Sequence, residues 1–310
     1  MQNLSIIVVG SSNTDMVIKT PHLPTPGETI LGGTFFMNAG GKGANQAVAA
    51  ARLGGKVTFI AKLGDDIFGK QALQLFREEG INTSCILTDS TYPSGVALIT
   101  VDEKGENCIA VASGANASLT ADDLALAENI VKEAGIILMQ LEIPVETVAY
   151  VAELAHKNKI KVILNPAPAC VLPDELLQNI SIITPNQNEA EMLTGIAVTD
   201  DISALEAAVA LHKKGITEVI ITLGAEGALV FSDNEYRMIT PPKVIAVDST
   251  AAGDVFNGAL AVAIAEGVNI FDAADFACRA AAISVTRLGA QASAPFRREI
   301  IGQQVIKSLG

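Results

Sequence analysis

The order of short aliphatic runs and helical segments from Leu119 onward constrains the fold of this chain more than any other feature. Each run has the length of a buried strand, and the segment between two runs has the apolar spacing of a helix. Strands that are joined by helices in this way lie parallel, with helices on both faces of the sheet. Strands are predicted over 136–140, 161–164, 181–184 and 218–222, and helices over 120–134, 145–157, 172–178, 187–194 and 203–214.

The two ends of the chain extend the same pattern. Leu4 to Val9 is an aliphatic run that ends in Gly10, which is typical of a buried parallel strand. The sequence therefore predicts a three-layer αβα sandwich around a mainly parallel central sheet. Further strands are predicted over 57–61, 228–232, 236–240 and 244–247, and further helices from Gly41 or Lys42 to the Gly54-Gly55 stop, from Asp65 or Asp66 to Gly80, and over 253–266, 271–286 and 296–308.

Two segments, approximately 11–37 and 93–113, interrupt the alternation. The first is rich in Pro, Gly and Thr, and the second has the pattern of a hairpin with DEKGEN as its turn. We expect them to form a small β-sheet that acts as a lid over the carboxyl edge of the main sheet, where ligands of α/β proteins bind. No repeat or charged linker divides the chain, so we expect a single domain over 1–310.

Composition argues against several kinds of partner. The formal net charge of −13 disfavours a nucleic-acid groove or an anionic membrane surface. No apolar run approaches the length of a membrane span, and the start MQNLSIIVVGSS lacks the basic region of a signal peptide. The four cysteines have no C-x-x-C spacing and the three histidines no metal-ligand spacing. We therefore expect a cytoplasmic protein with buried thiols and without zinc chemistry.

Polar side chains follow the ends of several predicted strands. Asn13 and Asp15 come after the first strand, and Glu142 comes after the strand at 136–140. Asn186 and Glu189 share one face of a helix start, where Glu189 could serve a metal ion or its waters. Each has a simpler explanation. Asn13 and Asp15 could form an Asx turn, Glu142 could be a solvated loop carboxylate, and Glu189 could belong to a capping box with Thr184 or Asn186.

Two glycine-containing turns offer backbone N–H groups to a ligand. Gly40-Gly41-Lys42-Gly43-Ala44-Asn45 joins a turn to a helix start, although a tight left-handed turn explains it nearly as well. TLGAEG, from Thr222 to Gly227, follows a strand and suits close approach to phosphates, but alone it is weak evidence. In contrast, GDDIFGKQ at 64–71 is interpreted as a capped helix start, because Gln71 replaces the Ser or Thr of a Walker A loop.

The stretch VDSTAAGDVFNG, 247–258, places small residues directly before a helix start. Free N–H groups and the positive end of the helix dipole make such a turn an anion site. Asp254 would repel a bound phosphate, so it is either a helix cap or a base beside the group that receives the phosphate. The second reading gains from position, because the polar residues at the other strand ends should meet at this same edge of the sheet. These are Asn13, Asp15, Glu142, Asn186, Thr222 and Asp254.

Four motifs resemble one family. GGKGANQAVAAARLGGKVTFIAKLGDDIFG is similar to the N-terminal signature of the ribokinase family of sugar kinases (the phosphofructokinase B group), and DSTAAGDVFNGAL to its C-terminal signature. NQNE resembles the N-x-x-E magnesium motif of the family, and TLGAEG its nucleotide loop. Many members have Gly-Ala-Gly-Asp where this chain has Ala251-Ala252-Gly253-Asp254. Ala251, LNPAPA and ITPN favour the ribose-phosphorylating members.

The resemblance implies a ribokinase-like fold and transfer of the ATP γ-phosphoryl group to O5 of D-ribose. Asp254 would be the general base, and the amides of Ala252 and Gly253 would form the anion hole, with Ala251 as a further catalytic position. The sugar would contact Asn13, Asp15, Gly41, Lys42, Gly43, Asn45, Glu142 and Asp254. The nucleotide would contact Asn186, Glu189, Thr222, Gly224, Gly227, Gly253 and Cys278, with Glu189 acting on Mg²⁺ through water.

The resemblance also implies a monovalent cation, usually K⁺, beside the anion hole. The matching positions are Asp248, Thr250, Ser284, Gly289 and Ser293. Members of this type often form homodimers through the lid, and exposed edge strands there would give a physical motive.

Three alternatives stay open. The substrate could be fructose, deoxyribose, a nucleoside or 2-keto-3-deoxygluconate. The chain could also be a non-catalytic sugar or nucleotide sensor, although a sensor would not need Asp254, Asn186 and Glu189 together. A dinucleotide-dependent oxidoreductase is disfavoured, because the first strand ends in GSSNTD and lacks G-x-G-x-x-G.

Overall fold

A computed structural model describes residues 4–125 and 127–300. Within that part of the chain, the large sheet has the order β13-β12-β11-β10-β9-β8-β1-β4-β5. Neighbouring strands are parallel except β11–β12 and β12–β13. The mainly parallel central sheet is therefore confirmed. Its strands are β1 (Ser5–Val9), β4 (Lys56–Gly64), β5 (Ile86–Asp89), β8 (Ile136–Met139), β9 (Lys161–Leu164), β10 (Ile182–Ile183), β11 (Glu218–Thr222), β12 (Ala228–Ser232) and β13 (Glu235–Ile239).

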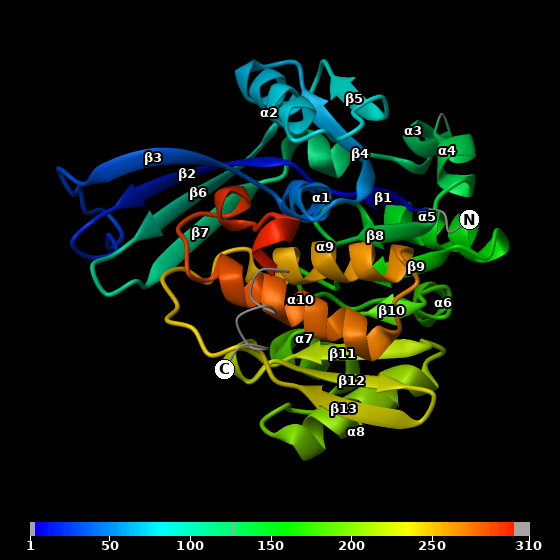
Figure 1. Cartoon of the computed structure of the whole chain (residues 1–310). Coiled ribbons are helices and arrows are strands. Elements are labelled where there is room, and N and C mark those ends of the chain that lie inside the picture. The colour runs from blue at the N-terminus through cyan, green and yellow to red at the C-terminus, as the bar shows by residue number, and fades with distance from the viewer. Residues whose placement is uncertain (1–3, 126, 301–310) are drawn as a thin grey trace.

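Helices cover both faces of this sheet, as the alternation predicts (Figure 1). Side chains alternate along β1, so that Ile6 and Val8 pack on one face while Ile7 and Val9 pack on the other. The first face is covered by α1 (Lys42–Arg52), α2 (Ile67–Glu78), α9 (Ala252–Ala265) and α10 (Ile270–Ser284). The second is covered by α3 (Ala121–Ala125), α4 (Glu128–Lys132), α5 (Val145–Lys157), α6 (Asp174–Leu177), α7 (Gln187–Thr194) and α8 (Asp201–Lys213).

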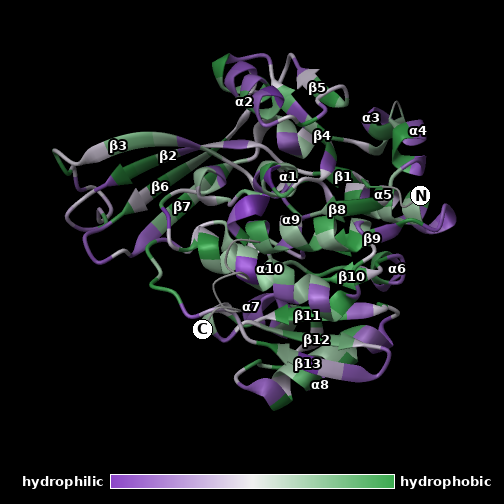
Figure 2. Cartoon of the chain, in the orientation of Figure 1, coloured by the Kyte–Doolittle hydropathy of each residue, from purple (hydrophilic) through white to green (hydrophobic). Residues whose placement is uncertain are grey.

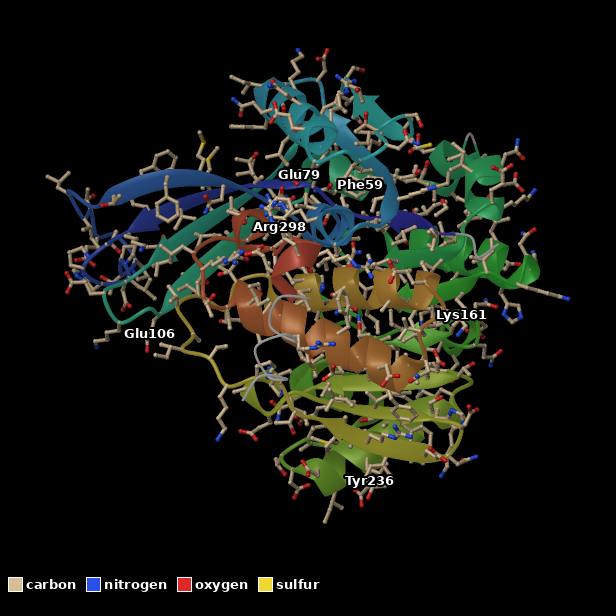
Figure 3. The ribbon with its side chains drawn as sticks, in the orientation of Figure 1. Phe59, Glu79, Glu106, Lys161, Tyr236 and Arg298 are labelled. Atoms are coloured by element: carbon tan, nitrogen blue, oxygen red, sulfur yellow. The ribbon has the colours of Figure 1, made fainter. Side chains whose placement is uncertain are left out.

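A second, four-stranded sheet projects from the body of the molecule (Figure 1). Its strands are β2 (Asn13–Lys19), β3 (Thr34–Gly40), β6 (Gly95–Val101) and β7 (Asn107–Ala112), in the order β3-β2-β6-β7. Both segments that interrupt the alternation contribute to it, and β2 joins it directly to the end of β1. Figure 3 marks Glu106 in the β6–β7 turn at its tip, and Tyr236 on the edge strand β13 of the large sheet.

The strand predicted over 244–247 is wrong. Val244, Ile245 and Val247 are exposed, and the run forms a loop in which Val247 N–H donates to the Val285 carbonyl oxygen at 2.7 Å. In the part of the chain that the structure describes, no strand pairs with this run through backbone hydrogen bonds. Aliphatic residues alone could not reveal this, because a strand needs a partner as well as propensity.

Other boundaries also differ. The helix predicted over 120–134 is two short helices, since Ala127 N–H donates to the Leu124 carbonyl three residues back and tightens the turn. The strand β5 was not predicted at all. Three short segments are 3₁₀ helices, namely η1 (Gly114–Ser118), η2 (Gly224–Glu226) and η3 (Gln291–Ser293). Of the helix predicted over 296–308, residues 297–300 are helical and 301–308 lie outside the described residues.

Asp66 caps α2, because its carboxylate accepts from Gly69 N–H at 2.8 Å. The capped start predicted for GDDIFGKQ is thereby confirmed.

No helix among the described residues is both long and apolar enough to cross a bilayer.

The crossing of α1 and α9 depends on a glycine in the middle of α9. A Cβ at Gly258 would lie 2.8 Å from both the Gln46 carbonyl oxygen and the Ala49 Cβ, and 2.9 Å from Ala50 N. The two helices therefore approach closely enough to bring the side chains of α1 against the start of α9.

We expect Gly258→Ala to destabilise the protein by about 1–3 kcal/mol, because backbone atoms of α1 cannot rotate away from the added methyl group. The higher helix propensity of alanine offsets only about 1 kcal/mol of this cost. Thermal unfolding of the variant measures the difference. An unfolding temperature above that of the wild type would contradict the close crossing.

Candidate active site

A cleft of about 200 Å³ opens at the carboxyl edge of the large sheet. It lies among the starts of α1, α7 and α9, which the connections after β3, β10 and β13 bring together. Of the residues predicted for the site, it contains Lys42, Asn186, Glu189, Thr222, Ala251, Ala252, Gly253 and Asp254, and it also contains Asn165, Ala167, Thr184, Ser249 and Asn257.

Asp254 does not cap its helix. The N-cap of α9 is Ala251, which adopts a left-handed conformation with a φ of 59°, and no side chain caps the helix. The Asp254 side chain is instead buried, and accepts hydrogen bonds from Asn45 Nδ2 at 2.9 Å and Gln46 Nε2 at 3.0 Å. Burial raises the pKa of Asp254, while Lys42 and the two amides oppose the rise and Glu142 adds to it.

Lys42 supplies the positive charge of the cleft. It follows Gly41, which has a φ of 88° and no room for a side chain, because a Cβ would lie 2.6 Å from Asn13 N. Burial alone would lower the pKa of Lys42, but the carboxylates of Asp254, Glu142 and Glu189 outweigh it and raise the pKa. Lys42 is therefore a cation that lines the cleft together with Asp254 and is stabilised by three carboxylates.

Asp15 and Glu142 form the acidic side of the site. Glu142 Oε2 accepts from Ser11 Oγ at 2.5 Å and from Lys42 N–H at 3.0 Å. The pKa of Asp15 is raised to about 6 by burial, by Glu142 and by Asp254. Gly40 leaves the space that the Asp15 carboxylate occupies, since a Cβ there would lie 2.2 Å from Asp15 Oδ2.

Asn13 is held in place by Asn116, a residue that was not predicted for the site. Asn116 Nδ2 donates to Asn13 Oδ1 at 2.8 Å and to the Ser12 carbonyl oxygen at 3.1 Å, and Asn116 Oδ1 accepts from Ser12 N–H at 2.9 Å. Asn116 lies in η1, just after β7, and no neighbouring motif marked it. Gly43, also predicted to face a ligand, packs on the backbone of Gly10 and Ser11 instead, because a Cβ there would lie 2.5 Å from Ser11 N.

Asn186 and Glu189 form the capping box that the sequence left open. Glu189 Oε2 accepts from Asn186 N–H at 2.9 Å, and Asn186 Oδ1 accepts from Glu189 N–H at 2.9 Å. Glu189 nevertheless lines the cleft, and burial raises its pKa. Asn186 also forms a parallel bridge to Thr222, so the two predicted nucleotide contacts are adjacent.

The TLGAEG loop has two glycines in conformations that favour glycine. Gly224 has a φ of 59° and open space around it, whereas Gly227 has a φ of 98° and no room beside the Ile239 carbonyl oxygen. Gly227 therefore shapes the turn, and Gly224 leaves its outer side accessible.

Cys278 is buried in the core on α10 and is not among the residues that line the cleft. Burial raises the pKa of its thiol to about 12.

Hydrogen bonds to Asp248 link three of the predicted cation residues. Asp248 Oδ1 accepts from Thr250 N–H and Oδ2 from Gly289 N–H, both at 2.9 Å. These bonds outweigh the effect of burial and lower the pKa of Asp248. Ser284 and Ser293 are buried, and their hydroxyls donate to the carbonyl oxygens of Ala281 and Ala290. The oxygen-rich set suits a hard cation. Among the described residues, no cluster of three or more His, Cys, Asp or Glu side chains could hold a metal.

The chain is similar over most of its length to known carbohydrate kinases. The model of the pfkB family carbohydrate kinases matches residues 3–297. A ribokinase of Haemophilus influenzae is 48% identical over 297 residues, which are 96% of this chain and 97% of that protein. A deoxyribokinase of Salmonella typhi is 37% identical, covering 94% of this chain and 96% of that protein. The structure of Arabidopsis thaliana ribokinase complexed with ribose and ATP is 33% identical with a TM-score of 0.89, covering 97% of this chain and 98% of that one. The chain belongs to the pfkB family of carbohydrate kinases.

Proposed function

We propose that this protein transfers the γ-phosphoryl group of ATP to the O5 hydroxyl of D-ribose, giving D-ribose 5-phosphate. The observation that carries the proposal is the buried Asp254 carboxylate, which two amides hold at the open start of α9 beside Lys42. Relatives at up to 48% identity that are named ribokinase, and one such structure with ribose and ATP, support the choice of substrates.

Asp254 acts as the general base. Each carboxylate oxygen accepts one amide hydrogen bond, so lone pairs remain for the acceptor hydroxyl. Burial makes the carboxylate more basic, and Lys42 keeps it charged. A base whose pKa is raised toward the working pH removes the hydroxyl proton more effectively.

The start of α9 receives the transferred phosphoryl group. The N–H groups of a first helical turn have no partners within the helix, and the dipole adds positive potential. Space around Gly253 is open. Ala252 N–H donates to the Ser249 carbonyl oxygen at 3.2 Å, and this bond is exchanged when phosphate oxygens arrive. Lys42 balances the developing charge.

The nucleotide occupies the side of the cleft formed by Asn186, Thr222 and the Gly224–Gly227 turn. Glu189 faces the cleft with lone pairs free beyond its capping bonds, so its carboxylate fits the waters of a magnesium ion. Mg²⁺, when bound with ATP, neutralises phosphate charge. The sugar occupies the other side, where Asn13, Asp15, Lys42, Asn45 and Glu142 offer directional partners for its hydroxyls.

Asp248, Thr250, Ser284, Gly289 and Ser293 would hold a monovalent cation, K⁺, behind the turn that precedes α9. Support comes from the Asp248 bonds, which link the 248–250 turn to Gly289. A cation there would fix the backbone from which the anion hole is made. The small sheet would close on the sugar and exclude water, which limits hydrolysis of ATP.

One face of the small sheet supports the proposal of a homodimer. The strand registers place Met37, Met16 and Leu98 in one row and Phe35 and Ile18 in another row on the same face. Leu98, Phe35 and Met37 are at least half exposed, and Figure 2 shows hydrophobic residues along these strands. Sedimentation equilibrium tests the association, and a monomer at every concentration would contradict it.

A panel of sugars assayed for ADP release, with and without K⁺, tests the function. We expect D-ribose to give the highest kcat/KM, above deoxyribose, fructose, nucleosides and 2-keto-3-deoxygluconate, and K⁺ to raise the rate with ribose. A different preferred sugar would overturn the choice of ribose as substrate, and binding without ADP release would favour a sensor.

In the same assay, Asp254→Asn should lower kcat by about 10²–10⁴-fold while ATP affinity changes little, because general-base catalysis has that magnitude. Retention of more than about a tenth of kcat would contradict the base assignment.

Ribose affinity should depend on pH through Asp15. Its raised pKa of about 6 means that the carboxylate is charged at pH 7 and gains a proton as the pH falls through that value. If the charged form binds the sugar, Kd for ribose should rise about tenfold between pH 7 and pH 5. Titration calorimetry measures this dependence. In Asp15→Asn, ribose should bind more weakly at pH 7 and with much less pH dependence, and an unchanged slope would assign the titration to another group.

A further inference from the structure

Gln46 is the second donor to the Asp254 carboxylate and has no place in the predicted site. It follows Asn45 on α1, and its side chain is fully buried. It is not among the residues that line the cleft, so it lies behind the carboxylate rather than beside a substrate.

The orientation of the Gln46 amide is determined by three partners. Nε2 donates to Asp254 Oδ1 at 3.0 Å and to Asn165 Oδ1 at 3.1 Å, while Oε1 accepts from Gln140 Nε2 at 2.5 Å. An ionised carboxylate can only accept, so a rotated amide would place its oxygen against Asp254 and its NH₂ group against the Gln140 NH₂ group. Both N–H groups and the oxygen of Gln46 are therefore used.

The partners come from separate elements of the fold. Gln140 follows β8, Asn165 follows β9, and Gln46 lies on α1. Gly10 confines Gln140, since a Cβ at Gly10 would lie 2.1 Å from Gln140 Oε1, and Gly258 confines the backbone of Gln46. The amide is thus fixed to the sheet and to α9 at once.

We propose that Gln46 is a positioning residue for Asp254, whose amide sets the plane of the carboxylate so that one oxygen faces the acceptor hydroxyl. This inference rests on the proposed function, in which Asp254 is the base. The Asn45 bond to Oδ2 alone would leave the carboxylate free to turn about Cβ–Cγ, and the Gln46 bond to Oδ1 removes that freedom. Because the Gln46 amide is neutral, it orients the Asp254 carboxylate without adding charge to a site that already contains Lys42, Asp15, Glu142 and Glu189.

Gln46→Met tests the proposal, because methionine keeps the approximate length of the side chain and cannot donate. We expect kcat for ribose phosphorylation to fall by about 10- to 100-fold, the range expected for loss of a hydrogen bond to a charged group, with KM for ribose and ATP changed by less than about threefold. The acidic limb of the kcat–pH profile should move to higher pH, because the lost donor favoured the charged form of Asp254. Lys42, Asp15, Glu142 and Glu189, which face Asp254 from the other elements, are present in both proteins.

Thr147→Val is the matched control. Thr147 is also buried, and its Oγ1 donates to the Leu119 carbonyl oxygen at 2.7 Å on the opposite face of the sheet. This variant should lose stability while its kcat and its pH profile remain those of the wild type. Thermal unfolding of both variants separates loss of fold from loss of positioning.

Gln46→Met in the Asp254→Asn background completes the test. If Gln46 acts through the base, the second substitution adds little to the loss caused by the first. The inference would be overturned if Gln46→Met lowered kcat by the same factor in the Asp254→Asn background as in the wild type. It would also be overturned if the Gln46→Met enzyme had an unshifted pH profile and a kcat within about twofold of the wild type. A wild-type protein that phosphorylates no sugar would instead refute the proposed function.

Discussion

A carboxylate that is removed from water must be given donors and a counter-charge, and most of this site serves that need for Asp254. Asn45 and Gln46 donate to its two oxygens, and Lys42 supplies the positive charge. All three lie on α1, so the arrangement depends on how closely α1 crosses α9. That approach depends in turn on Gly258, where no larger residue fits without moving backbone. The reactivity of the Asp254 carboxylate therefore depends on the close packing of α1 against α9.

Much of the fold could be predicted from local pattern. The alternation after Leu119 predicted the parallel sheet and its flanking helices, and the end points of α5, α7, β9 and β11 were predicted to the residue. The family, inferred from two long signatures, is confirmed. The strand predicted over 244–247 is wrong because composition alone favours it, whereas no strand among the described residues pairs with the run and its Val247 N–H donates to the Val285 carbonyl oxygen. The two residues of β10 show a related limit, because the ladder covers Ile182 and Ile183 and not the whole strand predicted over 181–184.

The site was harder to predict than the fold, for a physical reason. Residues at strand ends could be named, because topology alone brings them to one edge. Asn116, Asn165 and Gln140 could not, since they act by contacting other side chains across more than 90 residues of sequence. Buried amides carry no periodic signal, and a glutamine in a helix is ordinarily a solvent-facing residue. Glu189 shows a further limit, because its capping box and its position in the cleft coexist, and the sequence presented them as alternatives.

The strand β2 has two unlike faces. Asp15 points to the side of the sheet that carries Asn38 and Ala97, while its neighbours Met16 and Ile18 point to the apolar side. Subunit association through the apolar side would stiffen the strand that presents the carboxylate to the sugar. Affinity for the sugar would then rise with protein concentration, and dilution would weaken binding without any change in the residues that touch the ligand.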